Sequence, residues 1–473
     1  MRQLSEQESA LLNADNPRAN ANLSYLLIYD QGTAPGAKLR FKSILAHIES
    51  RLDRSPLFRS RLQRVPFELD CPYWVDDEHF DLEYHVRHIA LPKPGDWRQF
   101  CIQVSRIHAR SLDLNRPPWE IYVIEGLDSF IDLPAGSFAL LVKLHQAALG
   151  GRRRSEIVDL LHDLRPEPLP GPPPAPWFAG SAPDALDLMA RSAWHLAFSP
   201  LRWFGPVLRV AQASQAFAAD LLHPEPNTAT RFNAVVSPHR VFDTRRFLRE
   251  EVERIAALVP GARIEDALAA VCAGGLRSYL DAQGELPDHD LQARVEGVPG
   301  AIDAPTRMDP GEGESTSRGL HLGTNLADPI ERLAALVAQQ GAAAATPRWA
   351  ACTLAELPGP DEPQFLLGAR MTYFSAILPI ADGQGLVFAV SAYDGRIIVS
   401  PTSCRELLPD PEAFTQCLRD SFQEYLALAD LRPAAPRASA PGRRRRAAPK
   451  ARKAATALAA APGARPRSTA RPR

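Results

Sequence analysis

The stretch KLHQAALGG, residues 143–151, places a histidine between an apolar segment and a pair of glycines. An imidazole with its ordinary pKa of about 6.5 can accept a proton at neutral pH and then return it, so His145 is a candidate general base. The next residue, Gln146, carries an amide with no useful basicity. A histidine near a strand end is also a common hydrogen-bonded core residue, and both interpretations stay open at this point.

Other side chains that could do chemistry have plainer interpretations. The acidic run at residues 76–78, beside His79, is interpreted as a solvated turn rather than an acid–base or metal site. Asp266 stands near the start of a predicted helix, where the helix dipole favours a negative charge. The cysteines show no C-x-x-C pair and no metal-ligand spacing, so we expect reduced, mostly buried thiols and no metal. They are Cys71, Cys101, Cys272, Cys352, Cys404 and Cys417.

Strands and helices that would position these residues alternate through the first 165 residues. Runs rich in apolar, aromatic and β-branched residues predict strands over 23–30, 119–127 and 137–146. The third of these strands leads directly into KLHQAALGG. One-sided apolar spacing predicts a helix that opens near Phe41 and another that contains Ile157.

A second α/β segment is predicted over residues 230–431. Residues 243–261 read as a helix with Asp243 as its N-cap, and residues 264–280 as a central helix that is apolar on nearly every side. Two apolar strands around Asp394–Gly395 predict a β-hairpin, and a helix over 411–429 closes this segment.

The two α/β segments are joined by an unusual region. Residues 165–178 are rich in proline, which excludes helix and central strand. The mostly apolar residues 182–222 follow, and three of the seven tryptophans lie between Trp177 and Trp203. They predict either interfacial helices on a membrane or lipid body, or a helical bridge packed between two lobes.

The charge of the chain is strongly asymmetric. Residues 432–473 contain 13 Lys and Arg and no acids, which leaves 41 bases against 55 acids elsewhere. With this composition the tail is predicted to be disordered. It resembles the tails of histone-like proteins and could bind nucleic acid or anionic lipid, or serve as a solubilising or intramolecular partner for the acidic body. The polar N-terminus and the lack of a long apolar run predict a cytoplasmic protein, peripheral on an inner membrane or lipid inclusions at most.

Several sequence blocks resemble, in order, the bacterial wax ester synthase and diacylglycerol acyltransferase family. LDLNRPPWEIYVIEGL, residues 112–127, is similar to the R-P-L-W-E block of that family. VSPHRVFD, the 264–288 stretch, NLADPIERL and AYDGRIIVSPTSCRELLPD follow in the family's order and spacing. The family belongs to the superfamily of chloramphenicol acetyltransferase and of peptide-synthetase condensation domains.

The resemblance implies an α/β (α+β) fold with two chloramphenicol-acetyltransferase-like lobes and a tunnel between them. Acyl-CoA would enter this tunnel as a substrate, with no cofactor, and meet a long-chain alcohol or diacylglycerol. The family motif is His-His-x-x-x-Asp-Gly, whose second His is the general base. On this chain the motif positions are His145, Gln146 and Gly150, so the base and the Asp are both replaced.

The resemblance also implies substrate-binding positions at Trp119, Asp266 and Gly359. Nearby blocks depart from the family pattern: an N-D pair is Glu265–Asp266 here, and S-N-V-P-G-P is replaced by residues 355–360, AELPGP. A strand pattern ending in Arg is matched by residues 298–303, which end in Asp303. Scaffold positions are retained while positions nearest the chemistry have changed.

These observations predict lobes over 1–164 and 230–431, a connector with interlobe helices over 165–229, and a tail over 432–473. The predicted function is acyl transfer from acyl-CoA in wax ester or triacylglycerol synthesis, weakened or lost with the motif. The alternative is an inactive member that binds lipid or an acyl ligand, tethered to nucleic acid or an anionic membrane by its tail.

Overall fold

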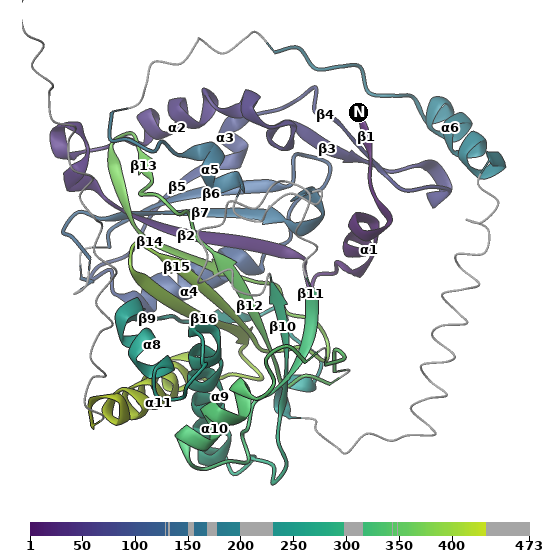
Figure 1. Cartoon of the computed structure of the whole chain (residues 1–473). Coiled ribbons are helices and arrows are strands. Elements are labelled where there is room, and N and C mark those ends of the chain that lie inside the picture. Colours follow the sequence, from purple (N-terminus) through teal and green to yellow (C-terminus); the bar gives the residue numbers. More distant parts are fainter. Residues whose placement is uncertain are drawn as a thin grey trace, which may run out of the picture. The chain divides into compact units, whose positions relative to one another are not determined.

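The computed structural model describes residues 1–127, 129–130, 133–149, 156–167, 177–198, 230–297, 316–342, 344–347 and 349–431. These residues belong to one compact unit, Met1–Leu431. Predictions for Gly150, for residues 298–303, for most of the proline-rich connector, for the apolar region after residue 198 and for the basic tail lie outside the described residues. The described part is a mixed α/β fold, as predicted (Figure 1).

A six-stranded sheet contains the strand whose last three residues begin the KLHQAALGG stretch. Its order is β13-β14-β2-β7-β6-β5. The strands are β13 (Phe365–Leu366), β14 (Ala369–Ile377), β2 (Asn22–Asp30), β7 (Phe138–His145), β6 (Trp119–Glu125) and β5 (Val86–Ala90). β2 and β7 are buried along nearly their whole length, because one face packs on α4 (Trp97–Ala109) and the other on the main core.

One long strand of the six-stranded sheet comes from the second of the two α/β segments that the sequence predicts. β14 comes from the second α/β segment, yet it pairs antiparallel with β2, with Ile377 opposite Ser24 and Phe374 opposite Leu27 (Figure 1). Tyr25 and Phe374 stack across this pair with ring centroids 5.8 Å apart. The predicted division at residue 230 therefore does not separate the two sheets, because apolar strands far apart in sequence complete one sheet.

A seven-stranded sheet forms from the later residues. Its order is β11-β10-β12-β15-β16-β8, and β9 also pairs with β16. The strands are β11 (Thr316–His321), β10 (Gln292–Gly297), β12 (Cys352–Pro358), β15 (Val387–Tyr393), β16 (Arg396–Cys404), β8 (Arg240–Phe242) and β9 (Arg245–Leu248). The predicted hairpin is confirmed: Asp394 and Gly395 both have positive φ, the conformation that a tight turn between β15 and β16 requires.

Four helices pack together beside the seven-stranded sheet: α8 (Arg249–Ala256), α9 (Ile264–Ala282), α10 (Pro329–Val337) and α11 (Pro411–Leu431). The predicted central helix is confirmed, since most of α9 is buried. A Cβ at Gly275 would lie 2.5 Å from the Leu418 side chain, so glycine lets α9 and α11 approach closely.

One local prediction is wrong. Asp243 does not cap a helix: residues 245–248 form β9, and α8 begins at Arg249. Phe247 stacks on Phe422 with centroids 4.1 Å apart, and Asp243 instead accepts hydrogen bonds from Trp97 and Thr415. Pairing with β16 and these contacts from distant elements outweigh the local helical pattern.

The acidic run at residues 76–78 is not simply a solvated turn. Asp77 is buried, and its backbone N–H donates to the carbonyl of Arg59. Asp76 accepts from the Gly180 N–H at 3.0 Å, and Glu78 accepts from the Ala182 N–H at 3.1 Å. These carboxylates hold the segment that leads into the next helix, α6.

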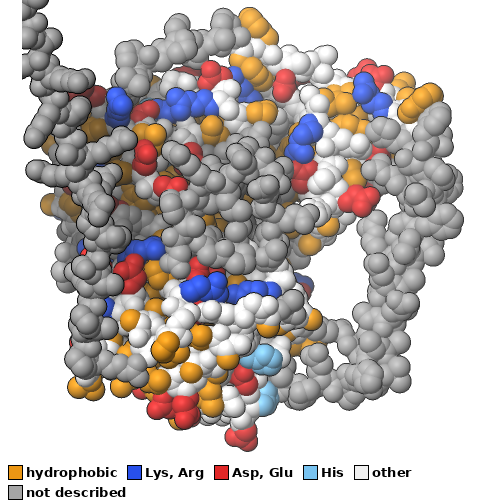
Figure 2. Space-filling model, in the orientation of Figure 1, with side chains coloured by type: hydrophobic (Ala, Val, Ile, Leu, Met, Phe, Trp, Pro, Cys, Tyr) orange, Lys and Arg blue, Asp and Glu red, His pale blue; other side chains and the backbone are white. Residues whose placement is uncertain are grey.

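α6 (Ala185–Phe198) packs on a three-stranded sheet of order β1-β4-β3, made of β1 (Arg2–Gln3), β4 (Tyr73–Asp76) and β3 (Ser60–Gln63). Leu188 on its inner face joins Val65, Tyr73 and Val75 in a small core. Figure 2 shows hydrophobic side chains gathered on the surface over α6 and the adjoining end of this sheet. The remaining helices of the first half are α1 (Glu6–Ala14), α2 (Phe41–Glu49), α3 (Leu82–His85) and α5 (Glu156–Leu161).

Candidate active site at the end of β7

His145 is the last residue of β7 and is 1 % exposed. Its backbone N–H donates to the Pro118 carbonyl at 3.0 Å, and Asn22 lies opposite it on β2. Gln146, which is half-buried, begins a 3₁₀ turn (Gln146–Leu149) and donates its N–H to the carbonyl of Ala21. The sheet therefore fixes the backbone of both motif residues firmly.

Both ring nitrogens of His145 face groups of the protein. Nδ1 accepts a hydrogen bond from the Ala147 backbone N–H at 3.2 Å. In a neutral ring this places the hydrogen on Nε2, which lies 3.7 Å from Oδ2 of Asp15. Burial raises the pKa of the Asp15 carboxyl, but the His145 ring and the Ala21 N–H outweigh it and hold that pKa below its usual value.

An Asp–His pair of this kind resembles two members of a catalytic triad. Here, however, the imidazole has no nitrogen lone pair free to accept a substrate proton. In a triad the carboxylate orients one ring nitrogen and the other nitrogen takes the substrate proton. In this protein the second nitrogen already accepts a backbone N–H. In this arrangement neither nitrogen of His145 has a lone pair free for a substrate proton, and Gln146, at the position of the expected base, offers only an amide.

Trp119 begins β6 and is completely buried. Its indole N–H donates to the Phe58 carbonyl at 3.0 Å, and its ring stacks on His85 with centroids 4.5 Å apart. Nδ1 of His85 lies 2.7 Å from the Trp119 carbonyl, and burial lowers the pKa of His85, so this imidazole is neutral and donates to that oxygen. Trp119 lies beside the motif, since it is opposite Leu144 on β7.

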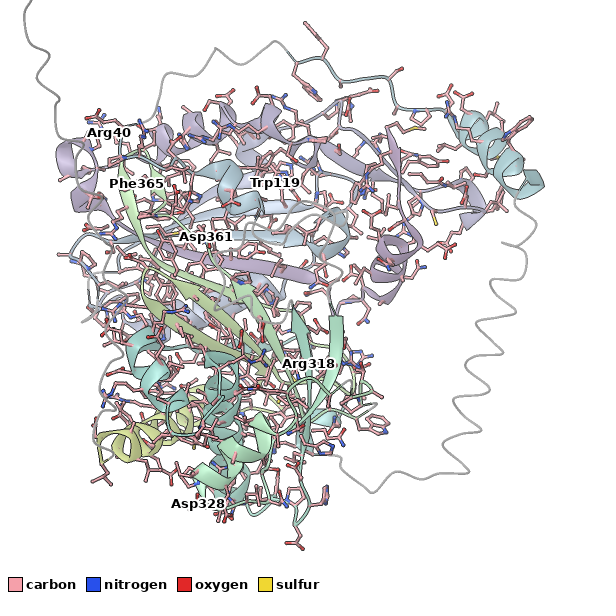
Figure 3. All side chains as sticks on the ribbon, viewed as in Figure 1. Arg40, Trp119, Arg318, Asp328, Asp361 and Phe365 are labelled. Carbon is pink, nitrogen blue, oxygen red and sulfur yellow. The ribbon has the colours of Figure 1, made fainter. Side chains whose placement is uncertain are left out.

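Asp266 lies away from the motif, at the head of α9. It accepts hydrogen bonds from the Arg263 backbone N–H at 2.8 Å and from the Gln340 amide at 2.5 Å, which fits the helix-terminal interpretation. It also lines a small pocket together with Glu356 and Arg318. Figure 3 labels Arg318 on β11 in the seven-stranded sheet and Trp119 on β6 in the six-stranded sheet.

Gly359 follows β12 at a point where three strands converge. A Cβ there would lie 2.5 Å from the Ala392 carbonyl and 3.0 Å from the Phe374 ring. The position therefore requires glycine for close backbone approach. The structure brings Trp119, His145 and Gln146 together and places Asp266 and Gly359 in other surroundings.

Sequence reasoning missed a charged row across the same sheet. Ser24 on β2, Lys143 on β7 and Glu120 on β6 are register partners. The completely buried Lys143 ammonium donates to the Arg110 carbonyl at 2.5 Å and lies 3.5 Å from Glu120, which accepts from Tyr122 at 3.0 Å. Burial lowers the pKa of Lys143 to about 8 even though Glu120 acts in the opposite direction.

No group of three or more His, Cys, Asp or Glu in the described part of the chain is arranged to hold a metal ion. None of the described helices is long and apolar enough to cross a membrane.

Comparison with known proteins agrees with the mixed α/β fold and with the sequence blocks. Residues 4–268 match the model of the wax ester synthase/diacylglycerol acyltransferase catalytic domain, and residues 324–425 match the C-terminal domain of the same family. The first match alone covers more than half of the chain. The protein belongs to the wax ester synthase/diacylglycerol acyltransferase family.

Individual relatives extend this result. A Mycobacterium tuberculosis (H37Rv) protein with the provisional name diacylglycerol O-acyltransferase is 26 % identical over 479 residues, 92 % of each chain. The wax ester synthase/diacylglycerol acyltransferase of Marinobacter aquaeolei VT8 matches the fold with a TM-score of 0.66 at 22 % identity, covering 90 % of this chain and all of that one. The first condensation domain of the calcium-dependent antibiotic synthetase matches with a TM-score of 0.51 at 17 % identity, covering 92 % and 98 %.

Proposed function

We propose that this protein binds an acyl-CoA donor and a long-chain alcohol or diacylglycerol, and that it transfers the acyl group slowly or not at all. Family membership supports the choice of ligands. The hydrogen-bonded state of His145 supports the loss of rate: Nδ1 is occupied by a backbone N–H and Nε2 faces Asp15. Loss of a general base typically lowers a rate by about 10²- to 10⁴-fold.

A second candidate is an active acyltransferase that uses His145 as its base. The Asp15–His145 pair favours this candidate, because a carboxylate beside an imidazole stabilises the imidazolium formed when a proton is taken. It requires the His145 ring to leave the Ala147 N–H, or the turn at 146–149 to move, before a substrate hydroxyl could reach a nitrogen lone pair.

An acyl-transfer assay with long-chain acyl-CoA and either hexadecanol or diacylglycerol separates the two candidates. The proposal expects little neutral lipid from the wild type and a gain of about 10²-fold or more in the Gln146→His, Gly150→Asp variant. Product at a substantial rate from the wild type, abolished by His145→Ala, would establish the second candidate. Gln416→Ala, which removes an exposed hydrogen bond to Asp420 within α11, serves as a control for altered folding.

We infer further that the protein reaches its apolar ligands by docking on a lipid surface. Four large apolar side chains from two chain segments stand out beside the three-stranded sheet: Phe67, Phe178, Leu186 and Trp194 are 84, 86, 79 and 66 % exposed. α6 supplies two of them while its opposite face is packed, the amphipathic pattern of an interfacial helix (Figure 2). Substrates with long acyl chains reside in such a lipid phase.

Flotation with phosphatidylcholine vesicles tests this docking. Replacing Phe67, Phe178 and Leu186 with Ser is expected to reduce the vesicle-bound fraction markedly while leaving the melting temperature unchanged, since these side chains are exposed. Val235→Ser and Trp349→Ser, exposed elsewhere, are the controls. Unchanged flotation of the triple variant would refute the docking surface.

A further inference from the structure

Three arginines belong to chain segments around β5 and β6, at the edge of the six-stranded sheet. Arg87 lies on the edge strand β5, Arg110 follows α4 and Arg116 precedes β6. The guanidinium carbon of Arg116 is 4.0 Å from the centre of the Tyr84 ring, and that of Arg87 is 5.1 Å from the same ring. Both guanidinium groups therefore contact the same aromatic ring.

These guanidinium groups have few acceptors of their own. Arg116 is 3.9 Å from Asp113 and Arg87 is 3.6 Å from Glu120, both beyond hydrogen-bond distance. In the described part of the chain, the Arg110 side chain forms neither a hydrogen bond nor an ion pair. Tyr84 accepts one hydrogen bond, through its carbonyl, from Nε of Arg87.

Glu120 lies 3.6 Å from Arg87 and is already engaged with other groups. It accepts from the Tyr122 hydroxyl and lies 3.5 Å from the buried Lys143 ammonium. Glu120 and Asp113 together face three arginines and this lysine, which leaves an excess of positive charge. An excess of this kind attracts anions.

The chemistry of the arginines selects the kind of anion. A guanidinium held over an aromatic ring by a cation–π contact can still donate from its terminal N–H groups as a fork. Forked donors match the oxygens of phosphate, and several guanidiniums suit a group that carries more than one negative charge. We propose that Arg87, Arg110 and Arg116 form a binding site for the phosphate groups of a ligand.

Two ligands could supply these phosphates: coenzyme A, or the headgroup of an anionic phospholipid. The coenzyme A source rests on the proposed function, whereas phosphate binding itself does not. Lys143 connects the two sites, because it contacts the Arg110 backbone and lies two residues before His145 on β7. A ligand anchored at the arginines is therefore close to the end of β7.

Titration calorimetry at low salt tests the site with pyrophosphate, coenzyme A, dephospho-coenzyme A, and phosphatidylcholine vesicles with or without phosphatidic acid. The Arg87→Gln, Arg110→Gln, Arg116→Gln variant is expected to lose about tenfold in affinity per arginine for pyrophosphate. The control replaces Arg18, Arg254 and Arg370, which are similarly exposed but each ion-paired with a carboxylate, by Gln.

Wild-type protein that binds no pyrophosphate, a triple variant with wild-type affinity, or an equal loss in the control would each overturn the proposal. Arg110→Gln alone guards against misfolding, because this side chain has no hydrogen bond or ion pair to lose; it too must weaken binding. Tight binding of coenzyme A but not of phosphatidic acid vesicles identifies the source as coenzyme A, and the reverse identifies the lipid. Because binding is read directly, absence of acyl transfer would refute the catalytic candidate and leave this site standing.

Discussion

Two neighbouring rows of one sheet use their polar side chains differently. In the row of Ser24, Lys143 and Glu120, the charged groups are enclosed and have partners inside the protein: a backbone carbonyl, a tyrosine hydroxyl and each other. Two residues further along β7, one ring nitrogen of His145 accepts a backbone N–H and the other lies 3.7 Å from Asp15.

The difference separates charge that supports the sheet from polar groups that could support chemistry. Lys143 sits where removal of one partner would leave a buried charge. Gln146 is half-buried just after the end of β7, where a change of side chain alters chemistry and leaves the sheet pairing intact. We call this end of β7, with His145, Gln146 and the neighbouring Asp15, the rim. If this distinction holds, changes in the charged row act on stability, and changes at the rim act on activity.

Lys143→Met should have the largest effect on stability. It leaves the buried Glu120 carboxylate with the Tyr122 hydroxyl and, at 3.6 Å, the partly exposed Arg87 guanidinium as close partners. Breaking a buried pair costs about 3 kcal/mol, and Arg87 offsets part of this loss. Urea denaturation at neutral pH measures the loss. The double variant Lys143→Met, Glu120→Leu is expected to recover part of it, and a single variant as stable as the wild type would show that the row does not hold the sheet.

The pH dependence of stability sharpens the same point. The pKa of Lys143 is about 8 in the folded protein and about 10.5 when unfolded, so between these values the unfolded chain binds more protons and the free energy of unfolding rises with pH. From pH 8 to 10 this contribution is roughly 2 kcal/mol. Buried thiols such as Cys352, whose pKa is raised by burial, act in the opposite direction.

The measurement is therefore the difference between wild type and Lys143→Met in urea denaturation at pH 8 and at pH 10. That difference cancels the thiols and retains the contribution of Lys143. It should grow by roughly 2 kcal/mol over this range. An unchanged difference would mean that burial does not lower the pKa of Lys143 in the folded protein.

Much of the fold could be predicted because its signals are local or periodic. The buried strand at 22–30, the central helix α9 and the hairpin around Asp394–Gly395 each follow from a short pattern of apolar residues with clear turn signals. β14 could not be placed, since an apolar run does not reveal which sheet it joins. The helical spacing near Phe247 misled for a related reason, because pairing with β16 decides the structure there.

The candidate site shows the same limit. His145 and Gln146 could be found from the sequence, because the flanking blocks fix their place. Asp15 could not, since it lies in a polar segment with no pattern and meets His145 only through the fold. Lys143 and Glu120 gave a faint signal, each a charge inside an apolar strand, but their pairing depends on the register between β6 and β7.

Asp15→Asn is expected to have a smaller effect than the changes at Lys143 and tests whether charge holds the His145 ring in place. The asparagine oxygen can still accept the Ala21 N–H, so only the attraction to His145 is lost, about 1 kcal/mol at pH 6. The pKa of Asp15 is lowered in the folded protein, so its stabilisation is present above the unfolded pKa of about 4 and is lost as pH falls below it. The difference between variant and wild type in urea denaturation should therefore shrink towards zero in acid. Glu253→Gln, which removes an exposed helix ion pair with Arg249, should cost less at either pH. A difference for Asp15→Asn that stays constant with pH would mean that shape rather than charge holds His145, and the rim would then resemble the rest of the core.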